Sequence, residues 1–389
     1  MNTPPLIICG MHRSGTSLVA GLLSACGLDV SPESLLMLHQ DDNPTGFYEN
    51  HEIVNMHENA LVRAGFGWDA PPDAEPAPAW DRSAALAEDA RMTASRYRGH
   101  DTWGFKDPRA SLFMGFWRSL FPGARFLVCL RNPLDVALSL QRRSGSSIPA
   151  GLALWQRYYE HIERDFDPAR DMAVHFDVLR RDPQGELTRL LLGFGLEGSP
   201  DQVREALAMI RPASADSGYS LLAARAHGLS ERGADLYSRF LERSGPGCTT
   251  LSAREPLAAL GAGFEVVKNQ GAWMGRQGTI LVDGSKATGT LVLSFNARST
   301  LLGSSPTGQL SLNISLDGHG ETSVTVTGDK PEQILLGLPQ TGQRTLTLTL
   351  RSSFASSPCA AGIGPDPRIL SVNVSGLQVV EQPVAPLQK

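Results

Sequence analysis

The stretch "LIICGMHRSGTSL", residues 6–18, decides the fold of the first part of the chain. It opens with a continuous apolar run, which is typical of a short strand buried on both faces of a parallel sheet. From Leu18 to Cys26 apolar residues recur at helical spacing, and Gly27 is a residue type that can end a helix. Two glycines, at positions 10 and 15, separate the two patterns. The stretch therefore predicts a strand, a turn that requires glycine, and a helix that begins in the turn.

The turn follows the pattern of a nucleotide phosphate loop except at one position. In the pattern G-x-x-x-x-G-K-[ST] the lysine reaches the β- and γ-phosphates, and this chain has Thr16 in its place. The backbone N–H groups at a helix N-terminus can still bind an anion. Arg13 adds a permanent positive charge, and Ser14 and Ser17 add hydroxyl groups. The turn therefore predicts a site for a compact anion that needs no Mg²⁺, and the alternative is a helix cap rich in Ser, Thr and Gly.

A second segment, "RNPLDVALSL" at residues 131–140, follows another apolar run that predicts a strand. Asn132 and the proline after it are suited to the start of a helix, so Arg131 is expected at the end of the strand beside that start. Ser139 lies about two helical turns after Asn132 and therefore on the same helical face. Arg131 and Ser139 can then hold a second anion, unless Arg131 binds sheet-end carbonyl groups and Ser139 faces solvent. Two anion sites at the carboxyl ends of parallel strands imply a ligand with two phosphate-type groups.

The pattern of polar and apolar residues changes near residues 244–250. Before this point strand and helix patterns alternate, which predicts an α/β domain over residues 1–243, with a P-loop-like parallel sheet flanked by helices. After it, runs such as Thr345–Leu350 alternate polar and apolar residues. This predicts an all-β sandwich domain of about seven antiparallel strands over residues 250–389. The strands predicted in the first domain cover residues 6–9, 103–106, 124–130 and 172–176.

The composition excludes several classes of protein. Hydrophobic residues make up 41% and charged residues 19% of the 389 residues, as in ordinary globular proteins. The net charge of −5 argues against a general nucleic-acid or anionic-membrane binder, although peripheral membrane contact stays open. No apolar run is long enough to span a membrane, and the first strand begins too early to leave room for a signal peptide. The five cysteines match no metal-site spacing, so we expect a cytoplasmic protein without a metal; its oligomeric state is not predicted.

Together the two anion segments resemble the sulfotransferases that use 3′-phosphoadenosine 5′-phosphosulfate (PAPS), in particular the bacterial and Golgi-type carbohydrate enzymes. "GMHRSGTS" resembles their 5′-phosphosulfate loop, and "RNPLDVALS" resembles their 3′-phosphate segment. The resemblance covers roughly residues 5–195, with both motifs in the correct order. Cytosolic members usually carry lysine where this chain has Arg13, whereas arginine is common in the carbohydrate-acting branches. The resemblance implies PAPS as donor, adenosine 3′,5′-bisphosphate (PAP) as product, and these donor-binding residues: His12, Arg13, Ser14, Gly15, Thr16, Ser17, Arg131 and Ser139.

The same resemblance implies three catalytic residues. Lys106, in "WGFKDPR", stands where heparan-type enzymes place a lysine near donor and acceptor, and the alternative is a surface lysine paired with Asp107. Glu49 completes a Gly-aromatic-aromatic-Glu pattern found in similar bacterial sequences and is the expected base, with His51 as the second candidate. Arg13 is expected to stabilise charge on the transferred group.

The expected function is transfer of a sulfuryl group from PAPS to a hydroxyl group of a glycan or glycolipid, with a protein tyrosine as a further candidate acceptor. The β-sandwich resembles accessory modules of bacterial cell-surface glycosyltransferases and sulfotransferases. This implies glycan binding or packing on the catalytic domain, with Trp273 either a glycan contact or a core residue. Two other functions stay open: a P-loop kinase of a small metabolite, which would need the missing lysine, and a nucleotide-binding protein of this fold without catalysis.

Overall fold

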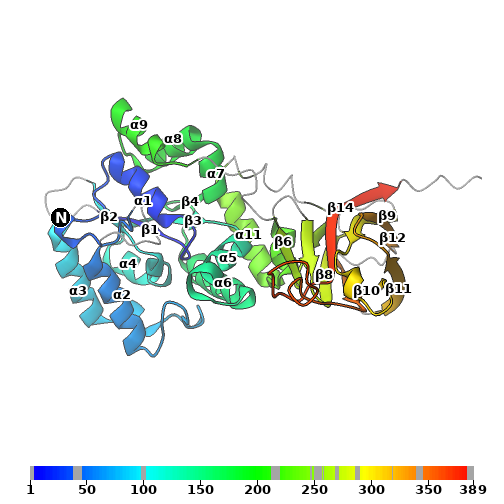
Figure 1. The fold of residues 1–389 in the computed structure, drawn as a ribbon. Coiled ribbons are helices and arrows are strands. Elements are labelled where there is room, and N and C mark those ends of the chain that lie inside the picture. The colour runs from blue at the N-terminus through cyan, green and yellow to red at the C-terminus, as the bar shows by residue number, and fades with distance from the viewer. Residues whose placement is uncertain are drawn as a thin grey trace, which may run out of the picture. The chain divides into compact units, whose positions relative to one another are not determined.

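The computed structural model describes residues 4–37, 46–97, 102–211, 220–245, 248, 256, 258–267, 271–284, 290–317, 319–338 and 345–382 (Figure 1). The chain divides into two compact units: residues 1–219 with 229–254, and residues 220–228 with 255–389. The division predicted between residues 243 and 250 differs from this one in the short helix α10 (Leu221–Ala226). This helix packs on strands of the second unit although it precedes the predicted boundary.

A parallel sheet of four strands lies at the centre of the first unit, in the order β2-β1-β3-β4. The strands are β1 (Leu6–Cys9), β2 (Gly104–Lys106), β3 (Arg125–Leu130) and β4 (Met172–His175). All their residues are buried except the first residue of β3 and of β4, which are partly exposed. Burial on both faces explains the continuous apolar runs in the sequence, and the predicted α/β fold is confirmed.

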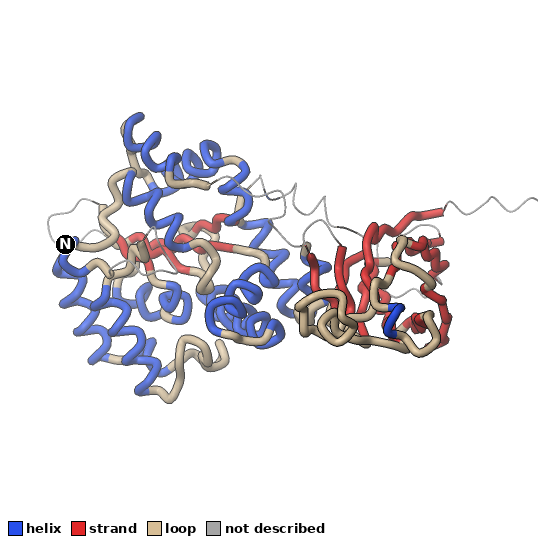
Figure 2. Tube along the Cα trace, viewed as in Figure 1, coloured by secondary structure: helices blue, strands red, loops and turns tan. Residues whose placement is uncertain are grey.

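Helices cover both faces of this sheet (Figure 2). They are α1 (Thr16–Ala25), α2 (His51–Arg63), α3 (Ala84–Ala94), α4 (Met114–Leu120), α5 (Pro133–Ser144), α6 (Ile148–Asp165), α7 (Phe176–Arg181), α8 (Pro183–Phe194), α9 (Pro200–Ala208) and α11 (Glu231–Arg243). On one face, α1, α8 and α9 share a core with the sheet, to which Leu22, Leu127 and Leu190 belong. In the part of the chain that the structure describes, no helix combines the length and the apolar character needed to cross a membrane.

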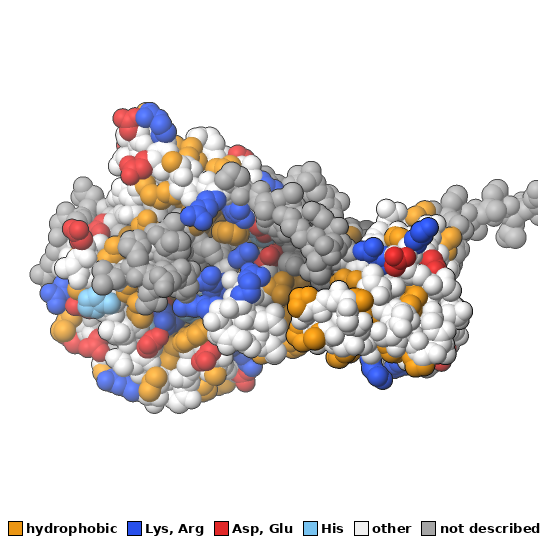
Figure 3. Space-filling model, viewed as in Figure 1, with side chains coloured by type: hydrophobic (Ala, Val, Ile, Leu, Met, Phe, Trp, Pro, Cys, Tyr) orange, Lys and Arg blue, Asp and Glu red, His pale blue; other side chains and the backbone are white. Residues whose placement is uncertain are grey.

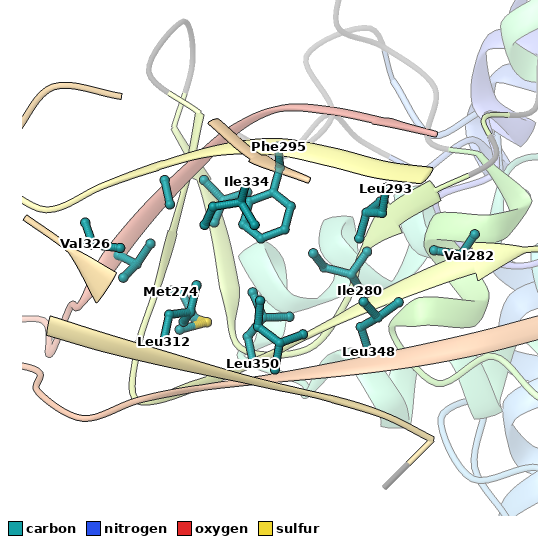
Figure 4. Close-up of a cluster of buried hydrophobic side chains, with 14 of the residues drawn as sticks. Met274, Ile280, Val282, Leu293, Phe295, Leu312, Val326, Ile334, Leu348 and Leu350 are labelled. Atoms are coloured by element: carbon teal, nitrogen blue, oxygen red, sulfur yellow. The ribbon is translucent and has the colours of Figure 1, made fainter. Parts of the chain in front are cut away.

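Two antiparallel sheets of five strands form the second unit, in the orders β11-β10-β13-β8-β5 and β12-β9-β14-β7-β6. The strands are β5 (Ala258–Leu260), β6 (Phe264–Val267), β7 (Gly271–Met274), β8 (Gln277–Asp283), β9 (Thr290–Arg298), β10 (Leu310–Leu316), β11 (His319–Val326), β12 (Glu332–Leu338), β13 (Thr345–Ser352) and β14 (Val372–Gln382). Side chains of both sheets meet in one core, for example Phe295 and Ile334 of one sheet and Leu312 and Leu350 of the other (Figure 4).

The predicted β-sandwich fold is therefore correct, but the predicted number of strands is too low. The described residues of the second unit contain ten strands rather than about seven. β5 and β6 have three and four residues, which is too short to display a clear alternation of polar and apolar residues. β12 was missed because its exposed face carries Leu335 and Gly337, so its sequence does not alternate between polar and apolar.

Candidate functional site

The turn after β1 depends on both of its glycines. Gly10 has a φ of 130° and Gly15 a φ of 87°, in the region that favours glycine. A Cβ atom added to Gly10 would lie 2.5 Å from the carbonyl oxygen of Cys129 in β3. One added to Gly15 would overlap the ring of Phe176, which follows β4. The two glycines therefore allow the turn to lie directly against the carboxyl ends of the neighbouring strands.

Helix α1 begins at this turn without a side-chain cap. Gly15 is the residue before its first turn and has no side chain that could cap the helix, and the first turn, which the structure describes in full, contains no acidic residue. The positive end of the helix dipole and its first N–H groups are thus suited to an anion. Around them, Ser14 and Thr16 are buried, whereas the other residues from position 12 to 17 are partly exposed.

Arg13 connects the two segments that were predicted to bind anions. Its side-chain Nε donates to Oγ of Ser139 at 3.1 Å, and its carbonyl oxygen accepts from Nη1 of Arg131 at 3.1 Å. Arg13 also has a φ of 70°, an unfavourable value for a residue with a side chain. Such a conformation persists only where the surrounding structure holds it, and it is frequent at functional sites. The structure thus brings Arg13, Arg131 and Ser139 together at the carboxyl ends of β1 and β3.

Arg131 is fixed beside the start of α5. The side chain of Asn132 accepts a hydrogen bond from the Leu134 N–H and caps the helix, as predicted. The Arg131 guanidinium carbon lies 4.8 Å from the centre of the Phe176 ring, and Nη2 of Arg131 lies 3.6 Å from Oδ1 of Asp135. Its buried Nε has no hydrogen-bond partner in the described part of the chain. Arg131 therefore retains a donor that a phosphate oxygen could use.

A buried ion pair lies at the end of the neighbouring strand β2. Nζ of Lys106, the last residue of β2, lies 2.5 Å from Oε1 of Glu49, and the two side chains are 2% and 9% exposed. Burial raises the pKa of the Glu49 carboxyl, although the positive charge of Lys106 opposes this shift. The alternative of a surface Lys106 paired with Asp107 is therefore wrong. His51, the second candidate base, begins α2 and is exposed.

A hydrogen-bonded chain lies beside this pair, and its members His57 and Trp117 were not predicted. Asp107 accepts from Nη1 of Arg109 and lies next to Nδ1 of His57, both at 2.8 Å, and Nε1 of Trp117 donates to Nε2 of His57 at 2.9 Å. Because Nε2 accepts this bond, the proton of a neutral His57 lies on Nδ1 and is donated to Asp107. Although burial opposes the shift, Arg109 and His57 hold the pKa of Asp107 well below its ordinary value. These hydrogen bonds fix the turn that follows Lys106.

The side chain of His57 in α2 is fully buried, which is unusual for a polar residue of a surface helix. The position of His57 relative to the apolar residues of α2 could have revealed its burial. His57 lies four residues after Ile53 and four before Leu61, on the apolar face of α2, and both of these residues are buried. A polar residue inside an apolar stripe must find hydrogen-bond partners, and Asp107 and Trp117 are those partners.

Trp68 contacts His12 in the turn after β1, and the sequence did not reveal this contact. Its ring centre lies 4.5 Å from that of His12, and its carbonyl oxygen accepts a hydrogen bond of 2.9 Å from the Tyr158 hydroxyl of α6. Burial lowers the pKa of His12 well below its ordinary value, and the positive charge of Arg109 acts in the same direction. Both effects favour the neutral form of His12, which adds no charge to the turn. No three His, Cys, Asp or Glu side chains among the described residues lie together as metal ligands would.

Comparison with known proteins identifies the first unit. The family described as "Sulfotransferase family" matches residues 4–201, which is half of the chain. Sulfotransferase STF9 from Mycobacterium avium is 16% identical over 62% of this chain and 77% of its own, with a TM-score of 0.43. The sulfotransferase domain of the Synechococcus PCC 7002 olefin synthase is also 16% identical, over 64% of this chain and 94% of its own, with a TM-score of 0.35. TmCBM61 in complex with β-1,4-galactotriose is 15% identical over 32% of this chain and 87% of its own, with a TM-score of 0.18. No curated protein matches the chain.

Proposed function

The chain belongs to the sulfotransferase family, and we propose that it transfers the sulfuryl group of PAPS to a hydroxyl group of a glycan or glycolipid. One observation carries the donor assignment: Arg13 is bonded to both Arg131 and Ser139 while it lies in the turn before the uncapped helix α1. The 5′-phosphosulfate would bind at the turn, and the 3′-phosphate would bind near Arg131 and Ser139. Figure 3 shows Lys and Arg side chains gathered near the middle of one face of the first unit, as a donor with several negative charges requires.

The buried pair of Glu49 and Lys106 supports the catalytic proposal. In the reaction the acceptor oxygen bonds to sulfur, the bond from sulfur to the bridging oxygen of the donor breaks, and PAP leaves with the negative charge. The acceptor proton must pass to a base, for which we propose Glu49. Lys106 would stabilise the charge that develops on the leaving and non-bridging oxygens, together with Arg13. A buried ion pair adds little to stability compared with apolar residues, so its presence favours a functional role.

Other observations support the acceptor class and the location. Both motifs resemble the carbohydrate-acting branch of the family, and this likeness supports a glycan or glycolipid acceptor. All five cysteines are free thiols and four of them are buried, which fits a reducing compartment. We therefore propose a cytoplasmic enzyme whose acceptor presents a sugar hydroxyl.

Transfer of a radiolabelled sulfuryl group to a bacterial cell-envelope extract tests this function. We expect label from PAPS to enter a polysaccharide or glycolipid fraction in buffer that contains EDTA. The variant Arg142→Ala, which removes an exposed arginine of α5, is the matched control and should transfer as well as the wild type. Label found only on protein would contradict the glycan acceptor. Phosphate transfer from ATP with Mg²⁺, in place of sulfuryl transfer, would show a kinase.

A further inference from the structure

The second unit carries a partly buried tryptophan on the outer face of one of its sheets. In β7 the two neighbours of Trp273, Ala272 and Met274, are buried on the core side of the sheet. Because side chains alternate along a strand, Trp273 lies on the opposite face, where it is only partly buried. The alternative of a core tryptophan is therefore wrong. The presence of a partly exposed indole on this face needs an explanation other than core packing.

Trp273 belongs to a row of side chains that crosses three strands. It pairs with Asn373 of β14, and Asn373 pairs with Arg298 of β9. Nε of Arg298 donates to Oδ1 of Asn373 at 3.3 Å, so the orientation of the amide group is fixed and its Nδ2 is a donor. Asn373 is 1% exposed, and Nδ2 has no hydrogen-bond partner among the residues that the structure describes. An amide donor buried without a partner is unfavourable, and an oxygen atom of a ligand would satisfy it.

The adjoining rows of this face carry mainly uncharged groups that form hydrogen bonds. One row contains Ser375, Asn296 and Gln333, and the next contains Gln378, Ser294 and Leu335. The outer face of the other sheet differs, because its described residues include no aromatic side chain and its central strand presents Thr345, Thr347 and Thr349. Of the two outer faces, as far as the structure describes their side chains, only the first combines an aromatic plane with amide and hydroxyl groups.

We propose that the outer face of the sheet β12-β9-β14-β7-β6 binds an uncharged polysaccharide chain. A sugar ring has an apolar face that can lie on the Trp273 indole, and its hydroxyl groups can accept from Asn373 and bond to the neighbouring amides. Among the side chains that the structure describes, the rows beside Trp273 contain no cluster of like charges, which fits an uncharged ligand rather than an anionic one. The choice of a glycan rests on the proposed acceptor, but binding at this face needs no sulfuryl donor.

Affinity electrophoresis of the full chain through gels that contain soluble galactan, mannan or xylan tests this proposal. At least one of these polysaccharides should slow the wild-type chain. Trp273→Ala and Trp273→Leu should each weaken binding about tenfold or more, because a central aromatic contact carries much of the affinity of such a site. Thr349→Ala, on the outer face of the other sheet, should bind as the wild type does.

The outcomes distinguish polysaccharide binding by the second unit from the proposed sulfuryl transfer. PAP binding and the melting temperature should be the same in the wild type and in Trp273→Leu, which keeps an apolar side chain against the sheet. The proposal is overturned if none of the three polysaccharides slows the chain, if both Trp273 variants bind as the wild type does, or if Thr349→Ala loses binding as they do. Loss of sulfuryl transfer with polysaccharide binding intact would instead count against the enzyme function alone.

Discussion

Glu49→Gln is expected to lower kcat at least about a hundredfold without weakening PAP binding, because a positioned base contributes about 10²–10⁴-fold to such a reaction. Glutamine keeps the shape of the side chain and can still accept a hydrogen bond from Lys106, but it cannot take the acceptor proton. Stopped assays of labelled transfer give kcat, and calorimetry gives the affinity for PAP. His51→Ala is the matched control, since His51 is exposed two residues further along, and it should keep near-normal turnover.

The pH dependence of kcat provides an independent test of the same residue. Glu49 acts as a base only when ionised, so activity should fall as the pH drops through its pKa in the folded enzyme. Burial raises this pKa above the ordinary 4.5 of a glutamate. The fall of kcat on the acid side of its pH profile, the acid limb, should therefore occur above pH 4.5. The limb should disappear from the residual activity of Glu49→Gln. A limb that persists in this variant and disappears in His51→Ala would make His51 the base.

Lys106→Met is expected to lower kcat about 10²–10³-fold, the usual cost of removing one group that stabilises developing charge. This variant also leaves the Glu49 carboxylate buried without its cation, which costs about 3–5 kcal/mol of folding stability. Thermal denaturation should therefore show a lower melting temperature than for the wild type. Activity must be assayed well below that temperature.

The double variant Lys106→Met/Glu49→Gln separates stability from catalysis. It removes both charges, so its melting temperature should recover most of the loss, while kcat stays as low as in the worse single variant. If the double variant recovered activity together with stability, the pair would have only a structural role. Near-normal turnover in a folded Lys106→Met protein would lead to the same conclusion.

Much of the first unit could be predicted because its signals are local. The run Leu6–Cys9 matches β1 at both ends, and Asn132 caps α5 where the sequence placed the helix start. The glycines at 10 and 15 indicated a turn that requires glycine, and their positive φ values and the added-Cβ contacts agree with this. Each of these inferences needed only a few consecutive residues.

The features that were missed depend on contacts between distant segments. The sequence did not decide whether Lys106 is buried, because the carboxylate that it contacts, Glu49, lies in a different part of the chain. The contact between His12 and Trp68 likewise requires the segment after α2 to return to the turn, and no local pattern encodes this path. The number of strands in the sandwich was underestimated for another reason, since short strands such as β5 contain too few residues to display a period.

The central claim is that the turn around Arg13 and the start of α5 together bind the two phosphate-type groups of PAPS. Calorimetric titration of the full chain with PAP in EDTA tests it most directly. We predict binding to the wild type and to Arg142→Ala without Mg²⁺, and an affinity about ten- to a hundredfold lower in Arg131→Ala, since a charge-assisted hydrogen bond is worth about 1.5–3 kcal/mol. Failure of the wild type to bind PAP, binding that requires Mg²⁺, or an unchanged affinity in Arg131→Ala would contradict the account.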